Sequence, residues 1–188
     1  MALTDNELII NANNGDVMAL EELIYRYDKM VLRLAMKYTG DSDDAKDIYQ
    51  EVFIRVYKNL SRFQFKSEFS TWLFRITSNV CISFKRKYNK QNHLSLNDED
   101  NSGYISSIPD EEALSPDSVV LNSENGDKIN EALNNLSPNQ KMSFLLKHYE
   151  GYKIREIAEM MNCKEGTVKK YLFDATKNLR KKLSPVYV

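Results

Sequence analysis

The chain has little proline, glycine or cysteine, and it lacks long apolar runs. Its 188 residues include 4 prolines, 6 glycines and 2 cysteines. Because proline and glycine are the strongest helix breakers, and because Leu, Lys, Glu and Ala are common, we expect an all-α protein. No stretch of about 18 apolar residues occurs, so stable membrane insertion is not expected. The first residues lack a basic region followed by an apolar core, which argues against a secretory signal.

The sequence also lacks the residue clusters that carry catalysis or hold metals. Cys81 and Cys163 do not have metal-ligand spacing, and we expect them to be free, buried thiols of a cytoplasmic protein. His93 and His148 are isolated. No glycine-rich loop is suited to cradle a phosphate, and no nucleophile is paired with a base. We therefore expect no catalytic residue, no metal site, no cofactor and no enzymatic activity.

The net charge of −1 conceals three segments of alternating sign. Basic residues dominate 62–90, nine acidic residues without any Lys or Arg occupy 97–127, and basic residues dominate again after residue 163. Two separated basic segments are suited to two contacts with one polyanion, such as DNA. Each basic segment alone is also compatible with a solvated helix face.

Helical periodicity divides the chain into two parts. The expected helices of the first part cover residues 4–13, 16–39, 42–60 and 68–89. Gly40 is the expected C-cap of the second helix, and four such helices can close one core as a bundle. Residues 91–122 are rich in Asn, Ser and acids and poor in large apolar residues, so we expect a flexible acidic linker. The predicted helical domains are therefore 1–90 and 123–188.

Aromatic residues cluster around the start of the fourth expected helix. Trp72 shares helical spacing with Phe69 and Ile76, which favours a place in the core. Phe63 and Phe65 fall instead in an expected loop between cationic residues, so they are less readily assigned to the core. Exposed aromatic rings beside cations are suited to stacking on unpaired bases.

The last quarter of the chain has the spacing of a helix-turn-helix. Ser137 followed by Pro138 is a typical helix start. Further along, apolar residues at helical spacing stop at Met161, a break follows at 162–164, and the apolar pattern resumes at Val168. So short a break allows only a sharp corner between two packed helices. The second helix is rich in Lys and Arg, which is typical of a helix that enters a DNA groove.

Two groups of motifs are similar to those of one protein family. In the first part they are 43–53 (DDAKDIYQEVF) and 69–79 (FSTWLFRITSN). In the second part they are 136–138 (LSP), 149–152 (YEGY), 154–158 (IREIA) and 165–169 (EGTVK). They resemble the second and fourth regions of the extracytoplasmic-function (group IV) sigma factors of bacterial RNA polymerase, in the sigma-70 family. The resemblance covers nearly the whole chain except the linker.

The resemblance implies three binding sites. The residues implied in binding core RNA polymerase, at its β′ clamp, are Asp47, Gln50, Glu51 and Arg55. The residues implied in recognising and melting the −10 element are Arg62, Phe63, Phe65, Lys66, Trp72, Asn79, Lys85, Arg86 and Lys87. The residues implied in −35 recognition are Lys164, Thr167, Lys169, Lys170 and Phe173. Tyr171 and Asp174 depart from the family, in which many members carry Arg at these positions.

The resemblance also implies partners and a function. The partners are the β′ clamp and β flap of core RNA polymerase, promoter DNA and an anti-sigma factor. The function is that of an initiation factor, which recognises −10 and −35 elements and promotes strand opening. An autonomous helix-turn-helix regulator remains the alternative, because it would use the second domain similarly but would need no polymerase surface. Two basic segments argue against a third possibility, a protein that sequesters such a factor.

Overall fold

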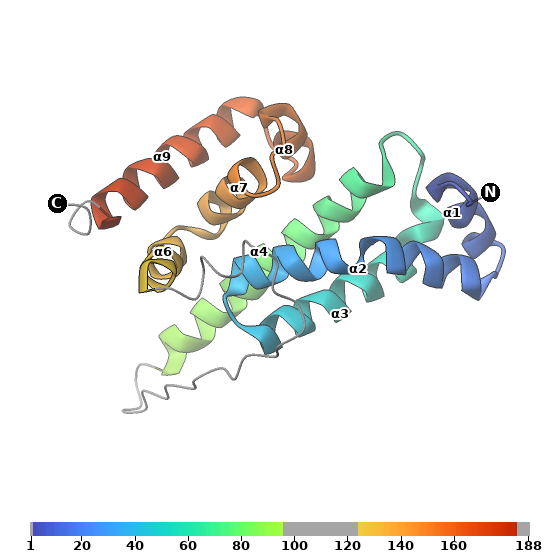
Figure 1. Cartoon of the computed structure of the whole chain (residues 1–188), viewed down its shortest axis with the longest axis horizontal. Helices are drawn as coiled ribbons and strands as arrows, with labels where there is room; N and C mark the ends of the chain where they lie inside the picture. Colours follow the sequence, from blue (N-terminus) through green and yellow to red (C-terminus); the bar gives the residue numbers. More distant parts are fainter. Residues whose placement is uncertain (1, 96–123, 184–188) are drawn as a thin grey trace.

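The computed structural model describes residues 2–95 and 124–183, and all regular elements within these ranges are helices (Figure 1). The elements of the first half are α1 (Asp5–Asn13), α2 (Val17–Thr39), α3 (Ser42–Asn59), the short 3-10 helix η1 (Leu60–Arg62) and α4 (Phe69–Ser95). Those of the second half are α6 (Glu124–Asn134), α7 (Pro138–His148), α8 (Ile154–Met160) and α9 (Glu165–Leu183). The expected all-α class is therefore confirmed.

Side-chain caps fix the ends of several helices. Thr4 and Glu7 form a capping box at the start of α1, and the Asp16 side chain accepts a hydrogen bond from the backbone of α2. Gly40 ends α2 in the left-handed conformation, with φ of 76°, which costs glycine little. Ser137 caps α7 in the same way as Thr4 caps α1. The predicted starts of α1, α2 and α7 and the predicted C-cap of α2 are confirmed.

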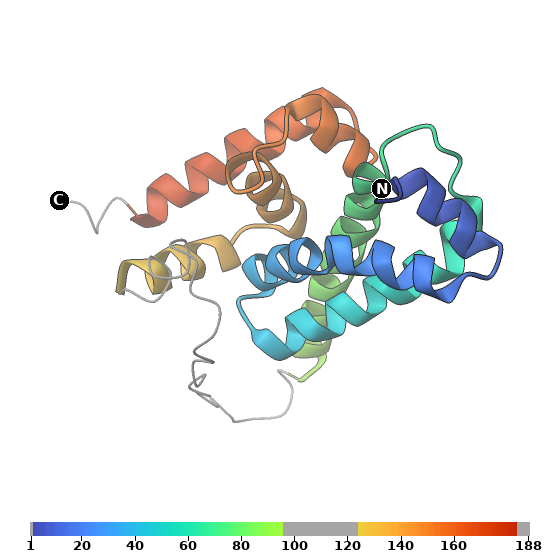
Figure 2. The ribbon, with the colours of Figure 1, turned by 45° about the vertical axis from the view of Figure 1, so that its right-hand side comes forward.

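The first half is a bundle of α1–α4 around one apolar core. The buried faces of α2 and α3 meet along most of their length, and α4 lies across them (Figure 2). The fully buried side chains include Leu8, Leu23, Leu34, Ile48 and Leu73. The predicted stripe of α3, from Ala45 to Leu60, is buried as expected.

The second half contains the predicted helix-turn-helix. Helices α8 and α9 pack on each other through Ile157, Val168 and their neighbours, and α7 covers both. The turn between them includes Asn162, which has a positive φ of 50°. Asn tolerates this left-handed conformation better than most residues, so it suits a sharp corner.

The two halves share a core, which the sequence analysis did not anticipate. One side of α4 faces α2 and α3, and the other side contacts α7 and α8 (Figure 1). The predicted stripe of α4, with Phe69, Leu73 and Val80, is buried as expected. On the second side, Phe74, Cys81 and Ile82 are buried as well. Figures 1 and 2 both show α4 on the side of the first half that faces the second half.

Helix α4 is also longer than predicted. It continues to Ser95, so residues 91–95, which we expected to begin the linker, are helical. No Gly or Pro occurs in this segment to break the helix. The remainder of the predicted linker, 96–122, lies outside the described residues.

Candidate nucleic-acid interface

The implied polymerase-binding residues lie on the outer face of α3. Asp47 and Gln50 are exposed, whereas Glu51 and Arg55 are half-buried. The Arg55 guanidinium donates to the Glu51 carboxylate at 2.7 Å, so these two side chains order each other one helical turn apart. All four lie away from the buried stripe of the helix.

Two apolar side chains on the same helix were missed by the sequence analysis. Ile54 and Tyr57 are exposed on α3, and the Tyr57 side chain is among the most exposed aromatic groups of the described residues. Their positions are out of phase with the buried stripe of the helix, and this was the available signal. Exposed apolar groups among polar ones are typical of a protein contact surface.

The loop before α4 buries one of its two phenylalanines and exposes the other. Phe63 is only 6% exposed and contacts Phe69 and Trp72, with ring centroids 5.9 and 5.3 Å apart. The expectation that the loop would keep Phe63 out of the core is therefore wrong. The reason is that η1 turns the chain back onto the bundle, so the ring fills the gap beside α4.

Phe65 behaves as the sequence analysis expected of a loop aromatic. Its side chain is 45% exposed, and its ring packs edge-on against Phe63 at 5.0 Å. Its φ of 54° is a left-handed conformation that is uncommon for a bulky residue. Arg62 and Lys66, which flank this aromatic pair, are both exposed. Trp72 is half-buried and packs against the core, in agreement with the spacing argument.

One face of α4 carries a row of polar side chains. Trp72, Asn79 and Arg86 follow one another at intervals of seven residues, and Asn79, Arg86 and the neighbouring Lys87 are exposed. Arg75 lies in the same row between Trp72 and Asn79, and it is also exposed. The sequence analysis had not assigned a role to Arg75. Lys85 differs, because it is half-buried beside Asp44 in a small pocket between the halves.

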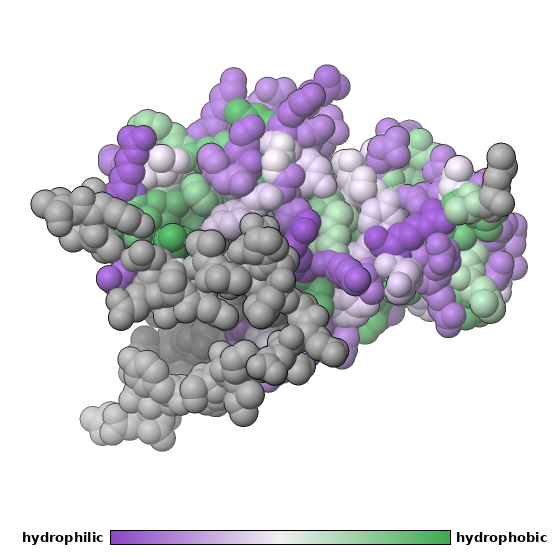
Figure 3. Space-filling model, in the orientation of Figure 1, coloured by the Kyte–Doolittle hydropathy of each residue, from purple (hydrophilic) through white to green (hydrophobic). Residues whose placement is uncertain are grey.

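The implied −35 residues lie on the outer side of α9 and at its start. Lys164, Lys169, Lys170 and Phe173 are exposed, and Thr167 is half-buried. The opposite side of the helix buries Val168 and Ala175, as predicted. Figure 3 shows mainly hydrophilic side chains along the upper edge of the molecule, over α8 and α9.

Of the two positions that depart from the family, the structure explains one. The Tyr171 hydroxyl accepts a hydrogen bond from the Asn139 side chain at 3.2 Å, which ties α9 to α7. This residue therefore contributes to the packing of the second half. Asp174 is half-buried, and nothing else in the structure explains it.

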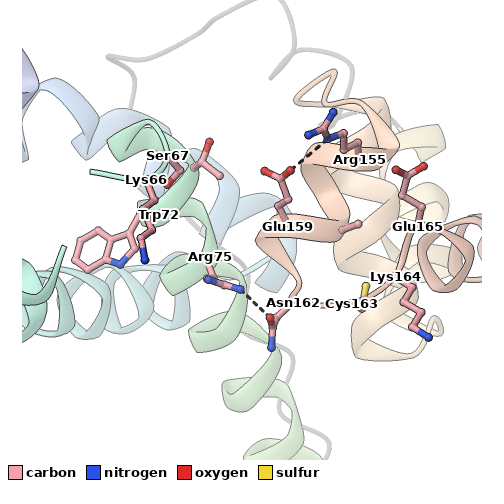
Figure 4. Close-up of a pocket in the computed structure, with 12 residues that line it drawn as sticks. Lys66, Ser67, Trp72, Arg75, Arg155, Glu159, Asn162, Cys163, Lys164 and Glu165 are labelled. Carbon is pink, nitrogen blue, oxygen red and sulfur yellow. Dashed lines mark hydrogen bonds and ion pairs between the residues drawn. The ribbon is translucent and has the colours of Figure 1, made fainter. Parts of the chain in front are cut away.

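A cleft of about 710 Å³ lies between α4 and the helix-turn-helix, although α4 also contacts α8 directly (Figure 4). One wall carries Lys66, Trp72 and Arg75, and the other includes Asn162 and Lys164. The Arg75 guanidinium donates to the Asn162 side-chain oxygen across the cleft at 2.8 Å. Members of the implied −10 set and of the implied −35 set therefore line the same cleft.

Polar contacts also join the halves on the far side of the shared core. Arg33 of α2 forms an ion pair of 3.0 Å with Glu150, whose side chain is only 5% exposed. The ammonium of Lys37 lies 4.3 Å from the centre of the Tyr149 ring, which is a cation–π distance. Together with the cleft contact, these pairs hold the second half on the first at several points.

Lys141 is a charged residue buried at the junction of the halves. Its side chain is 4% exposed, donates to the Asn134 side chain at 2.7 Å, and lies over the Tyr38 ring of the first half. Burial lowers the pKa of its ammonium to about 8, and the nearby Lys85 acts in the same direction. Burial likewise raises the pKa of the Cys81 thiol, on the facing side of α4, to about 12.

The described residues form neither a metal-binding cluster nor a membrane-spanning helix. Within residues 2–95 and 124–183, no cluster of three or more His, Cys, Asp or Glu side chains is placed to hold a metal ion. The same part of the chain contains no helix that is both long and apolar enough to cross a bilayer. Cys81 is a buried free thiol as expected, whereas Cys163 is only half-buried at the edge of the cleft.

Comparisons with known families agree with both halves of the chain. The family model of Sigma-70 region 2 matches residues 23–91, and that of Sigma-70, region 4 matches residues 126–179. The first match begins within α2 and ends within α4, so it includes α3 and the whole loop before α4, and the second begins within α6 and ends within α9, so it includes α7 and α8. The two regions thus occur in the order expected from the motifs.

Similar proteins extend the match to nearly the whole chain. The ECF RNA polymerase sigma-E factor of Haemophilus influenzae is 29% identical over 185 residues, which are 98% of this chain and 97% of that protein. The RNA polymerase sigma-H factor of Pseudomonas aeruginosa is 27% identical over 192 residues, which cover 97% and 95% of the two chains.

Solved structures show the same fold. The sigma factor RpoE of Bartonella quintana, in complex with the anti-sigma factor NepR, has a TM-score of 0.66 at 21% identity, covering 89% of this chain and 98% of its own. The protein CnrH, in complex with the cytosolic domain of CnrY, also has a TM-score of 0.66, at 19% identity, with 96% and 97% covered. Taken with the two region matches, these similarities mean that the chain belongs to the sigma-70 family of RNA polymerase sigma factors, in its extracytoplasmic-function group.

Proposed function

We propose that the chain binds core RNA polymerase, recognises both the −10 and the −35 promoter elements and promotes strand opening. The observation that carries this proposal is the presence of two different exposed surfaces with basic residues, on α4 and α9, in one chain with a polar outer face on α3. An autonomous helix-turn-helix regulator would account for α9 alone. It would leave the polar and aromatic surfaces of the first half without a role.

The outer face of α3 is the proposed contact with the β′ clamp. Asp47, Gln50 and the Glu51–Arg55 pair supply charged and hydrogen-bonding groups, while Ile54 and Tyr57 supply apolar area in their midst. A mixed surface of this kind gains affinity from the apolar groups and orientation from the charged ones. The second half is proposed to contact the β flap.

Promoter opening is proposed to depend on the loop before α4 and on the exposed row of that helix. Flipping a base out of the duplex costs a few kcal/mol, which stacking on an aromatic ring can offset. Phe65 is the exposed ring in the loop, and Phe63 supports it from the core. The Asn79 amide can donate to and accept from an unpaired base edge. The remaining cations, Arg62, Lys66, Lys85, Arg86 and Lys87, are proposed to hold backbone phosphates.

Recognition of the −35 element is proposed to depend on the start and outer side of α9. A helix after a sharp turn places its first residues at base edges in the major groove. Lys164 and Thr167 are at this end, and Lys169, Lys170 and Phe173 follow on the same side of the helix. Tyr171 is excluded from this set by its bond to Asn139.

The remaining aspects of the function are proposed from the family. The protein has no catalytic residue of its own, because the phosphodiester chemistry belongs to the polymerase. It acts in the cytoplasm with the predicted domains 1–90 and 123–188, of which the first is extended to residue 95 by α4, and the two are joined by the acidic segment that follows. An anti-sigma factor is a further proposed partner, since both solved structures named above are complexes with another protein and one of these is called an anti-sigma factor.

Run-off transcription with purified core polymerase tests the proposal. Sequencing transcripts after overexpression of the chain would first supply its promoters through a shared upstream motif. We expect the chain to direct core polymerase to such a promoter without any other sigma factor. Phe65→Ala should weaken opening of duplex templates more than that of templates with a pre-melted −10 region, whereas exposed Lys29→Ala on α2, outside the proposed binding surfaces, is a control for surface changes. A chain that binds the promoter but supports no initiation with core polymerase would favour the autonomous regulator.

A further inference from the structure

The contact between Arg75 and Asn162 joins parts of the chain that DNA should hold apart. Arg75 stands in the exposed row of α4 between Trp72 and Asn79, and Asn162 stands in the turn of the helix-turn-helix (Figure 4). The −10 and −35 elements lie about 25 base pairs apart, which is roughly 85 Å of B-form DNA at about 3.4 Å per base pair. In the structure, Lys66 and Lys164, one from each implied set, line a single cleft.

The docked arrangement therefore occupies Arg75 with a protein group instead of DNA. The guanidinium donates to a neutral amide oxygen, and no carboxylate pairs with it among the contacts of the described residues. An anionic phosphate oxygen accepts from a guanidinium more strongly than a neutral amide does, and the O6 and N7 of guanine accept two bonds from it at once. Asn162 thus holds Arg75 with a bond that an anionic nucleic acid can replace.

We propose that Arg75 is an additional DNA contact in the exposed row of α4, and that Asn162 sequesters it while the two halves are docked. The inference rests on the proposed function, because it assumes that this row faces promoter DNA. It assigns a role to a side chain that the resemblance left unassigned. It also makes the turn of the helix-turn-helix a competitor of the −10 strand for the same guanidinium.

The conformation of Asn162 provides a clean variant. Its φ of 50° lies in the left-handed region, which glycine adopts without strain. Asn162→Gly should therefore keep the turn and remove only the amide that holds Arg75. Arg75→Ala removes the guanidinium itself. The matched control is Arg155→Ala, since Arg155 lines the same cleft but pairs with Glu159 of its own helix at 3.5 Å.

Docking can be measured through a native thiol. Cys81 is fully buried on the side of α4 that the second half covers, so a thiol reagent reaches it when the halves separate. In a Cys163→Ser background, we expect both Asn162→Gly and Arg75→Ala to label about fivefold faster, as the loss of one hydrogen bond of ordinary strength implies. Arg155→Ala should label at the parent rate. Unchanged labelling in both Asn162→Gly and Arg75→Ala would overturn the sequestration.

Nucleic-acid binding tests the second part of the inference. The probe is a fluorescein-labelled, 30-nucleotide single strand of mixed sequence, titrated with the full chain at low salt. Asn162→Gly should bind it about fivefold more tightly, because a larger fraction of molecules has Arg75 free. Arg75→Ala should bind more weakly than Asn162→Gly, and adding Asn162→Gly to Arg75→Ala should change nothing. An equal gain from Asn162→Gly in the Arg75→Ala background would show that Arg75 is not the group released.

Run-off transcription separates failure of this inference from failure of the proposed function. If the parent chain initiates transcription but Asn162→Gly and Arg75→Ala leave labelling and binding unchanged, the inference is wrong and the proposed function stands. If Asn162→Gly and Arg75→Ala respond as expected but neither the parent chain nor its variants initiate transcription with core polymerase, the contact is real and its assignment to promoter DNA is wrong.

Discussion

The two halves of the molecule bury their apolar residues in different ways. The buried apolar residues of the first half, α1–α4, all belong to one core, whereas those of the second half are divided between that core and a smaller cluster. Met142, Leu146 and Ile157 belong to the core shared with α4, while a separate small cluster joins α6 to α9. The residues of this small cluster are Ala132, Leu133, Leu136, Ala175 and Leu179. The second half therefore depends on docking for much of its burial, and the first half does so at one face of α4 and where α2 contacts α7.

The largest effect should come from the core of the first half. Ile48→Ala removes a fully buried side chain between α3 and its neighbours, and it should lower the free energy of unfolding by about 2–5 kcal/mol. Because the second half packs on this bundle, both halves should unfold together. Urea denaturation followed by circular dichroism measures the loss. Retention of a folded second half under conditions that unfold the first would contradict the dependence.

The second comparison is between the shared core and the small cluster. Leu146→Ala, at the shared core, should cost about 2–4 kcal/mol and should also speed thiol labelling of Cys81, because it weakens docking. Leu133→Ala, in the small cluster, should cost about 2 kcal/mol and leave that labelling near the parent rate. Hydrogen exchange should then place the effect of Leu133→Ala in α6 and α9. Equal labelling in the two variants would show that the clusters are not separate.

A smaller effect is expected from the ion pair at the junction. Arg33→Ala leaves the buried Glu150 carboxylate without its cation, but Arg33 is more than half exposed, so a cost of about 1 kcal/mol is expected. Glu150→Gln is the matched variant, because it removes the charge and retains the size of the side chain. It should lose less stability than Arg33→Ala. A loss that is equal at low and high salt would contradict an electrostatic origin.

A pH dependence of similar size should come from Lys141. Its pKa in the folded protein is about 8, below the ordinary value of 10.5, so the unfolded chain binds more protons between these values. The contribution of Lys141 to folding therefore becomes more favourable as pH rises from 7 to 9, by about 1 kcal/mol. Lys141→Met should remove this increment.

The measurement is the difference in unfolding free energy between parent and Lys141→Met at pH 7 and at pH 9. A difference is needed because buried tyrosines act in the opposite direction. Burial raises the pKa of Tyr38 and, to about 12, that of Tyr152, so the unfolded chain loses these protons first as pH rises. An identical pH response in parent and variant would show that the Lys141 ammonium is hydrated in the folded state.

Local sequence signals predicted the elements of the fold well. The capping side chains of Thr4, Asp16 and Ser137 and the glycine after α2 act within one turn, so the sequence alone contains them. The stripe of α3 was equally readable, because one face of that helix is buried and the opposite face is not. Such features require no knowledge of the distant chain.

Features that depend on contacts between the halves were not predicted. Phe74 and Ile82 fall outside the stripe expected for α4, and only the packing of α7 and α8 explains their burial. Phe63 was assigned to a loop, which gives no indication that η1 turns its ring inward. Lys141 illustrates the same limit, since a lysine in a helix is ordinarily exposed and here the Tyr38 ring covers it.

The two-sided burial of α4 has a consequence for synthesis on the ribosome. Helix α4 ends at Ser95 and α9 at Leu183, so 88 further residues must be translated before the second half is complete. At about 5–20 residues per second, this interval lasts roughly 4–18 s. During that time the side of α4 carrying Phe74 and Ile82 has no partner from its own chain. The nascent first half thus exposes an apolar surface, which chaperones can bind until the remaining helices emerge.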